Sequence, residues 1–287
     1  MTAPTLPAVE TTIAGVRSRL DAARGSGATI ALVPTMGSLH DGHLALVERA
    51  REIADVVIVS IFVNPMQFGP AEDFERYPRD LAADRDALVG HGVAAVFAPA
   101  ADEMYPTGAV QTRISSGPVG AVFEGRSRPG HFDGMLTVVA KLLGITQPHL
   151  AVFGEKDAQQ VYLVQRMVRD LDIRTRIEVV ETVRADDGLA LSSRNQFLGE
   201  RQRRAARAIP DALEAARSAA DRGLDPVIAA AQGVVMGADD VELDYFAVVH
   251  PDTFQPVDDG HSGPARALIA ARVGDTRLID TELLHLG

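Results

Sequence analysis

The segment Leu32–Val47 reads LVPTMGSLHDGHLALV and places two histidines, His40 and His43, three residues apart where an apolar run gives way to a helical pattern. The apolar residues ATIALV (28–33) at its start are typical of a buried strand. Apolar residues between positions 44 and 54 recur at three- and four-residue intervals, as on one helix face. The segment therefore predicts a strand that leads into a helix whose first turn carries both histidines.

Strand and helix patterns continue to alternate along the first 183 residues. Further strands are expected at 56–63, 94–98, 149–154 and 176–183, and helices near 9–20, 80–90, 134–144 and 157–170. Such alternation predicts a mostly parallel sheet covered by helices on both faces. Residues 1–183 are therefore expected to form a doubly wound, Rossmann-like α/β domain.

The pattern changes after residue 183. A polar connection leads to a helix over about 201–220 with an interruption at Pro210, a second helix at about 226–236, and strands at 241–249, 265–273 and 276–283. This order predicts a smaller α+β domain over 184–287, which we expect to act as a lid.

The composition restricts the class of protein. A net charge of -11 and a pI near 5.2 disfavour broad contact with nucleic acid or an anionic membrane, although a local basic pocket could hold a phosphate. The chain has no cysteine, which excludes disulfides, thiolate metal sites and cysteine nucleophiles. Its longest apolar run, VVIVSIFV (56–63), is shorter than the roughly 18 residues of a membrane span. We expect a cytoplasmic protein.

The position of the two histidines favours a binding role. In doubly wound sheets ligands bind beyond the carboxyl ends of strands, where helix starts expose free N–H groups. Gly37 allows a tight backbone path, and Gly42 allows a ligand to come close. The helix dipole disfavours imidazolium, so we expect neutral rings that donate N–H groups until a polyphosphate raises their proton affinity.

Two other interpretations of the histidines remain open. His40 and His43 could simply cap or pack the helix, which is a common role for histidine. They could also bind zinc, but no third ligand follows at a suitable spacing. The phosphate-binding motifs GxxxxGK[ST] and GxGxxG are absent at the expected places.

A second strand-to-helix transition occurs in FGEKDAQQ (153–160). It contains Lys156, one of only two lysines, and we expect Lys156, Asp157 and Gln160 to converge at the helix start. A mobile ammonium there suits phosphate oxygens. The alternative is a salt bridge between Lys156 and a neighbouring carboxylate.

Three further segments carry polar groups that could bind a ligand. IFVNPMQF (61–68) supplies two amides, of which we predict only Gln67 as a binding residue, because turn formation by Asn-Pro explains Asn64 equally well. In LSSRN (191–195), hydroxyls beside a guanidinium could grip an anion or could lie in a solvated linker. FEGRSRPGHFDG (123–134), with Arg128 and His131, fits a wall of the site or a plain surface loop.

Together these motifs resemble a known family. HxGH after a first strand resembles the signature of the nucleotidyltransferase superfamily. The longer string PTMGSLHDGHLALV, followed in order by IFVNPMQF, YPRD, FGEKDAQQ and LSSRN, resembles the pantothenate synthetase (pantoate–β-alanine ligase) family from about residue 28 to 198. The chain departs from the family pattern at Leu191, where methionine is usual, and at Ala158, where tyrosine is expected.

The resemblance implies a reaction and a set of site residues. ATP, with Mg²⁺ held largely by phosphate oxygens, would drive condensation of pantoate with β-alanine through a pantoyl adenylate, releasing AMP and pyrophosphate. It also implies a homodimer. The implied catalytic residues are His40, His43 (as proton donor), Lys156 and Arg194. The implied ATP-binding residues are Met36, Gly37, His40, Gly42, His43, Gly154, Glu155, Lys156, Asp157, Val183, Leu191, Ser192, Ser193 and Arg194. Gln67 and Gln160 would bind pantoate, with Gln67 also near β-alanine. No protein ligand of the metal is assigned, Asp84 included.

Other functions stay open on the residues alone. A nucleotidyltransferase with a phosphorylated acceptor would be expected to use cations in place of the two glutamines. A tRNA-charging enzyme fits poorly with the acidic balance, and a nicotinamide-dependent oxidoreductase should show GxGxxG after its first strand. A non-catalytic nucleotide-binding module would leave both glutamines and LSSRN without a role.

Overall fold

The computed structural model describes residues 6–69, 74–75, 77–108 and 110–287. The chain divides into two compact units. The first contains the described parts of Met1–Gly154 together with Leu163–Val180, and the second contains Glu155–Tyr162 and Glu181–Gly287. Among the described residues, no helix is both long and apolar enough to span a membrane.

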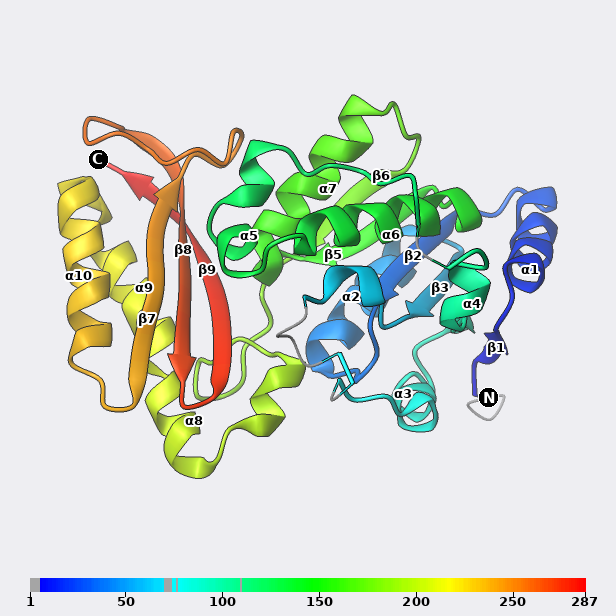
Figure 1. The fold of residues 1–287 in the computed structure, drawn as a ribbon, viewed down its shortest axis with the longest axis horizontal. Helices are drawn as coiled ribbons and strands as arrows, with labels where there is room; N and C mark the ends of the chain where they lie inside the picture. Colours follow the sequence, from blue (N-terminus) through cyan, green and yellow to red (C-terminus); the bar gives the residue numbers. More distant parts are fainter. Residues whose placement is uncertain (1–5, 70–73, 76, 109) are drawn as a thin grey trace. The chain divides into compact units, whose positions relative to one another are not determined.

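The first unit is built on a six-stranded parallel sheet with the order β1-β4-β3-β2-β5-β6 (Figure 1). Its strands are β1 (Ala8–Glu10), β2 (Ile30–Thr35), β3 (Val56–Ile61), β4 (Val93–Phe97), β5 (Leu150–Gly154) and β6 (Arg176–Val180). Its longer helices are α1 (Ile13–Gly25), α2 (Asp41–Ile53), α3 (Leu81–Ala87), α6 (His131–Thr146) and most of α7 (Ala158–Asp170). The predicted doubly wound α/β class is confirmed.

Helices cover both faces of this sheet because its central strands are apolar on both sides. Ile30 to Val33 of β2 are almost completely buried. On one face α2 packs Leu46, Val47 and Ala50 against β2, β3 and β5. On the other face α1 and α6 contact β2 and each other. β2 thus lies at the centre of the unit.

The strand order reverses beside β2. From β2 the chain proceeds through β3 to β4 on one side, and it returns to place β5 and β6 on the other. The carboxyl ends of β2 and β5 therefore flank the switch point, the usual ligand position in such sheets. Met36 and the histidine segment follow β2 directly at this edge.

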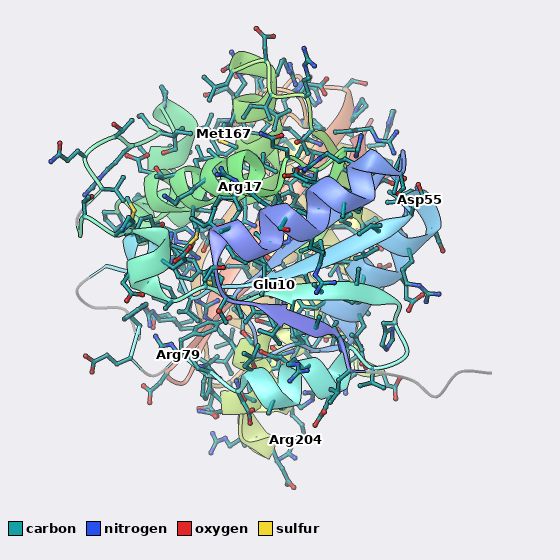
Figure 2. All side chains as sticks on the ribbon, turned by 90° about the vertical axis from the view of Figure 1, so that its right-hand side faces the viewer. Glu10, Arg17, Asp55, Arg79, Met167 and Arg204 are labelled. Carbon is teal, nitrogen blue, oxygen red and sulfur yellow. The ribbon has the colours of Figure 1, made fainter. Side chains whose placement is uncertain are left out.

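One expected helix begins later than predicted. Val9, taken as part of a helix over 9–20, lies in β1 and pairs with Val96 of β4. Thr12 caps α1 by accepting a hydrogen bond from the Gly15 N–H at 3.0 Å. Val9 imitates helical spacing, but the cap fixes the true start. Figure 2 labels Glu10 at the end of β1, close to α1, and its carboxylate accepts a hydrogen bond from Arg19 of that helix at 2.8 Å.

Several short elements of the first unit have no periodicity that would predict them. They are η1 (Pro65–Gln67), α4 (Ala101–Met104), η2 (Pro118–Ala121) and α5 (Glu124–Ser127). Each has three or four residues, which is too short for an amphipathic pattern.

The second unit contains an antiparallel sheet with the order β7-β8-β9. Its elements are η3 (Glu155–Asp157), η4 (Ser193–Phe197), α8 (Glu200–Ala206), α9 (Ala208–Ser218), η5 (Ala220–Arg222), α10 (Leu224–Met236), β7 (Val241–Val249), β8 (Gly263–Val273) and β9 (Thr276–Leu286). α9 and α10 pack on one face of the sheet (Figure 1). Alanines line much of this interface, among them Ala212, Ala216, Ala265, Ala267 and Ala271.

Two expectations about the second half of the chain differ from the structure. The helix break lies at Arg207, between α8 and α9, and not at Pro210, which sits in the first turn of α9 where a missing N–H is tolerated. The division between units falls at Val180 and Glu181, whereas 183 and 184 were expected. Residues 155–162 also join the second unit, because η3 packs on β9. Sequence periodicity does not reveal which sheet a helix start contacts.

Candidate active site

The two histidines cap the start of α2 reciprocally. His40 Nδ1 accepts a hydrogen bond from the Gly42 N–H at 3.2 Å, and His43 Nδ1 accepts one from the His40 N–H at 3.4 Å. Their ring centroids lie 4.1 Å apart. Because Nδ1 is the acceptor in each ring, a neutral ring carries its proton on Nε2. The capping interpretation is therefore correct, and in each neutral ring the N–H donor is Nε2.

Asp84 on α3 holds the loop that leads to the histidines. Its two carboxylate oxygens accept hydrogen bonds from the backbone N–H of Ser38 at 3.1 Å and of Leu39 at 2.7 Å. Gly37 and Ser38 both have positive φ, +84° and +54°, so the loop turns sharply here. Burial raises the pKa of the Asp84 carboxyl, while the two N–H bonds oppose this shift. No local sequence pattern predicts this role of Asp84.

Gln67 is buried in η1 and lies beside the histidine loop. Its Nε2 donates to the Met36 Sδ at 2.8 Å, and its Oε1 accepts from the Asn64 Nδ2 at 3.2 Å. The structure thus brings together Gln67 and Met36, two residues predicted to bind substrates.

Asn64 determines which way the Gln67 amide points. It is completely buried, and its Oδ1 accepts from the Tyr105 hydroxyl at 2.8 Å and from the Met66 N–H at 3.3 Å. Its Nδ2 donates to Gln67 and to the Gly134 carbonyl, at 3.1 Å for the latter. Asn64 therefore forms the expected turn and also orients Gln67. Tyr105 was missed because it lies 41 residues away.

His131 supports the backbone at Gln67. It is buried, its Nδ1 lies 2.8 Å from the Gln67 carbonyl oxygen, and its Nε2 lies 3.0 Å from an Arg128 guanidinium nitrogen. The carbonyl can only accept and the guanidinium can only donate, so Nδ1 carries the proton and Nε2 accepts. His131 is thus a core residue of the first unit, not part of a plain surface loop.

In the second unit, η3 carries Lys156 immediately after β5. The Lys156 ammonium lies 3.5 Å from an Asp157 carboxylate oxygen, so the ion pair of the alternative interpretation is present. Glu155 instead accepts a hydrogen bond from the Arg266 guanidinium at 2.8 Å. Gln160 lies in the first turn of α7, and its convergence with these side chains stays a prediction.

The LSSRN segment is folded and half-buried. Ser192 caps η4, and its hydroxyl accepts a hydrogen bond from the Arg194 N–H at 3.3 Å. The Leu191 N–H donates to the Val183 carbonyl at 2.9 Å, which brings these two predicted ATP-binding residues side by side. The Asn195 amide donates to the Ala190 carbonyl at 3.0 Å.

The ion pair between Arg184 and Asp280 connects the segment that precedes LSSRN to β9. Arg184 contacts both carboxylate oxygens of Asp280, at 2.5 and 3.2 Å, and also the Gly188 carbonyl. The Asp280 side chain is 1% exposed, and this burial raises its pKa against the opposing effect of Arg184. No local sequence pattern predicts this pair, because its members are 96 residues apart.

Both segments predicted to contact phosphates pack against the same strand, β9. η3, with Lys156, and η4, with Ser193 and Arg194, each contact β9 within the second unit. Ammonium, guanidinium and hydroxyl groups are common ligands of anions in proteins. The described residues include no group of three or more histidine, aspartate or glutamate side chains that could hold a metal ion.

The fold and these residues define a doubly wound α/β protein with an HxGH helix start at the switch point of its sheet. The family model described as pantoate-beta-alanine ligase matches residues 8–283. The chain belongs to this family. It is therefore an ATP-dependent ligase that joins pantoate to β-alanine by an amide bond.

Individual relatives agree with the family match. A pantothenate synthetase of Leifsonia xyli subsp. xyli is 56% identical over 257 residues, covering 90% of this chain and 89% of the relative. The crystal structure of pantothenate synthetase from Thermus thermophilus has a TM-score of 0.90 at 46% identity, covering 96% and 98% of the two chains. A pantoate-beta-alanine ligase of Francisella tularensis, complexed with beta-gamma ATP and beta-alanine, has a TM-score of 0.79 at 36% identity, covering 96% and 97%.

The turn before the histidines should not tolerate a side chain at Gly37. A Cβ there would lie 2.7 Å from Asp84 Oδ2, whereas one at Gly27, with a similar φ of +80°, would meet nothing within 4 Å. Gly27→Ala is expected to cost about 1 kcal/mol, and Gly37→Ala at least about 2 kcal/mol, because it also disturbs the Asp84 hydrogen bonds. Urea denaturation measures both, and equal losses would contradict this account.

Tyr105 should ionise at a higher pH than an ordinary tyrosine. Burial raises the pKa of its hydroxyl from 10.0 to about 12. Because the folded form retains the proton, this group's stabilising contribution is complete below about pH 10 and is lost as the pH rises towards 12. Tyrosinate absorbance after rapid pH jumps should show a late component that Tyr105→Phe removes. The control variant Tyr162→Phe, in the other unit, should retain that component.

Proposed function

We propose that the chain makes pantothenate in two half-reactions through a pantoyl adenylate. In the first, a pantoate carboxylate oxygen attacks the α-phosphorus of ATP, and the bond from this phosphorus to the bridging oxygen breaks to release pyrophosphate. In the second, the β-alanine amine attacks the activated carboxyl carbon, loses a proton and displaces AMP. The observation that carries the proposal is that the Lys156 and Ser192–Arg194 segments contact one strand of one compact unit.

The first half-reaction requires positioning and neutralisation of growing negative charge. We assign Lys156, Arg194 and the two serine hydroxyls to the phosphate oxygens and the departing pyrophosphate. His40 and His43 would donate from Nε2, with His43 as the proton donor, because capping engages each Nδ1. The other members of the proposed ATP set are Met36, Gly37, Gly42, Gly154, Glu155, Asp157, Val183 and Leu191.

Pantoate carries a carboxylate and hydroxyls, which a carboxamide can recognise as donor and acceptor. We assign Gln67 and Gln160 to pantoate, with Gln67 also near β-alanine. The fixed orientation of the Gln67 amide supports this role, since Asn64 engages its oxygen and leaves its nitrogen directed towards Met36. A carboxamide held in one orientation distinguishes donors from acceptors on its ligand.

The remaining parts of the proposal concern the setting of the reaction. Water would hydrolyse the adenylate, so we propose that residues 184–287 act as a lid that excludes it. Mg²⁺ would arrive as MgATP and be held mainly by phosphate oxygens. The cysteine-free composition fits a cytoplasmic enzyme, and we propose a homodimer on the family likeness.

Exchange of labelled pyrophosphate into ATP tests the first half-reaction. With pantoate present and β-alanine omitted, the wild-type protein should catalyse exchange, because adenylate formation is reversible. Lys156→Ala and His43→Ala should each slow it by roughly 10²- to 10³-fold, the usual effect of losing one donor to developing charge.

A surface variant controls for general damage. Arg166→Ala removes an exposed ion pair with Asp170 on α7 and should leave exchange unchanged. If exchange requires β-alanine, the proposed mechanism is wrong. If Lys156→Ala catalyses exchange at the wild-type rate, the proposed role of Lys156 is wrong.

A further inference from the structure

The residue next to Lys156 is held by the distant strand β8. Glu155 accepts a hydrogen bond from Arg266 Nη2 at 2.8 Å, and the two side chains are 21% and 14% exposed. Arg266 Nη1 also approaches the Thr281 hydroxyl of β9 at 3.4 Å. Arg266 therefore connects η3 to two strands of the same unit.

The η3 turn depends on such contacts for its shape. It consists of Glu155–Asp157 alone, and a single 3₁₀ turn of three residues has little stability of its own. Its contacts with β9 and the Arg266–Glu155 ion pair therefore determine where its backbone lies. The Lys156 side chain starts from this backbone and is itself only 16% exposed.

Charged groups of both signs surround the Arg266–Glu155 ion pair. Arg184 acts electrostatically on Glu155, and Lys156 acts on Asp280. Glu282 lies close enough to Glu155 and Asp280 for repulsion to contribute to its raised pKa. Without the Arg266 guanidinium, Glu155 would lose its hydrogen-bonded cation while the repulsion between Glu155 and Glu282 remained.

We propose that Arg266 is a positioning residue for ATP: by pairing with Glu155 it fixes η3, so that Lys156 stays in register with the Ser192–Arg194 segment on β9. This inference rests on the proposed role of Lys156 and Ser192–Arg194 in binding phosphate. Arg266 acts through Glu155 and does not itself touch the substrate.

A second ion pair in the same sheet provides a matched control. Arg277 on β9 bonds Asp244 on β7 through Nε at 2.9 Å and Nη2 at 2.7 Å, and the Arg277 side chain is 16% exposed. It is buried as deeply as Arg266 but contacts neither η3 nor η4 through this pair. A purely structural role would make the two arginines equivalent.

The first experiment compares Arg266→Gln with Arg277→Gln in steady-state kinetics and thermal unfolding. Both variants should lose some thermal stability. Only Arg266→Gln should raise the KM for ATP, by about tenfold, the scale of one charged hydrogen bond, while the KM for pantoate stays within about twofold. If both variants change the KM for ATP equally, Arg266 is not a positioning residue. Arg266→Lys, which keeps the charge but loses the planar fork, should show an intermediate rise and serves if Arg266→Gln does not fold.

A second experiment separates positioning from simple attraction of a cation for ATP. Arg266→Gln removes a positive charge and Glu155→Ala removes a negative one, so general electrostatics would shift the KM for ATP in opposite directions. Because Glu155 also belongs to the proposed ATP set, the double variant is decisive: positioning predicts a rise in both single variants and no further rise when the two substitutions are combined. Opposite shifts would overturn the inference.

Lys156→Ala distinguishes failure of this inference from failure of the proposed function. If Lys156→Ala loses pyrophosphate exchange while Arg266→Gln behaves like Arg277→Gln, only the role of Arg266 is refuted. If Lys156→Ala keeps normal exchange and a normal KM for ATP, the proposed phosphate site is itself wrong, and the inference falls with it.

Discussion

The start of α2 presents backbone N–H groups that no helical carbonyl can satisfy, and the first unit is organised around this constraint. His40 and His43 satisfy two N–H groups with their Nδ1 atoms, and Asp84 satisfies two more in the preceding loop. Capping also fixes the tautomer of each ring, since an accepting Nδ1 requires the proton on Nε2. The hydrogen bonds that begin the helix thus place the N–H of each neutral ring on Nε2, the atom from which we propose that both histidines donate.

The two units support their polar groups by different means. In the first, neutral amides and a tyrosine hydroxyl form a buried chain that ends at Gln67. In the second, the buried carboxylate of Asp280 and the half-buried Glu155 are each paired with an arginine. Neutral hydrogen bonds orient the amide that we propose for pantoate, whereas ion pairs hold the segments that we propose for the triphosphate.

The sequence predicted most of the long elements, because buried strands such as Ile30–Thr35 and amphipathic helices such as Asp41–Ile53 have clear periodicity. It also placed His40 and His43 at the helix start that follows β2, Gln67 after β3 and Lys156 after β5. It did not predict the supports of these residues. Tyr105, Asp280 and Arg266 meet their partners only through tertiary folding, at separations of 41, 96 and 111 residues. Local patterns also misassigned Val9. It lies in a strand of only three residues, and its spacing of four from Ile13 imitates a helix.

The alanine-rich interface between β8 and the helices that cover it has a mechanical consequence. Alanine has no rotamers to freeze or exchange, so packing Ala212 and Ala216 of α9 near Ala265, Ala267 and Ala271 of β8 costs no side-chain entropy. These alanines also have no side-chain rotamers by which their part of the interface could repack. We therefore expect the alanine-lined part of this interface to rearrange little when a nucleotide binds at η3 or η4.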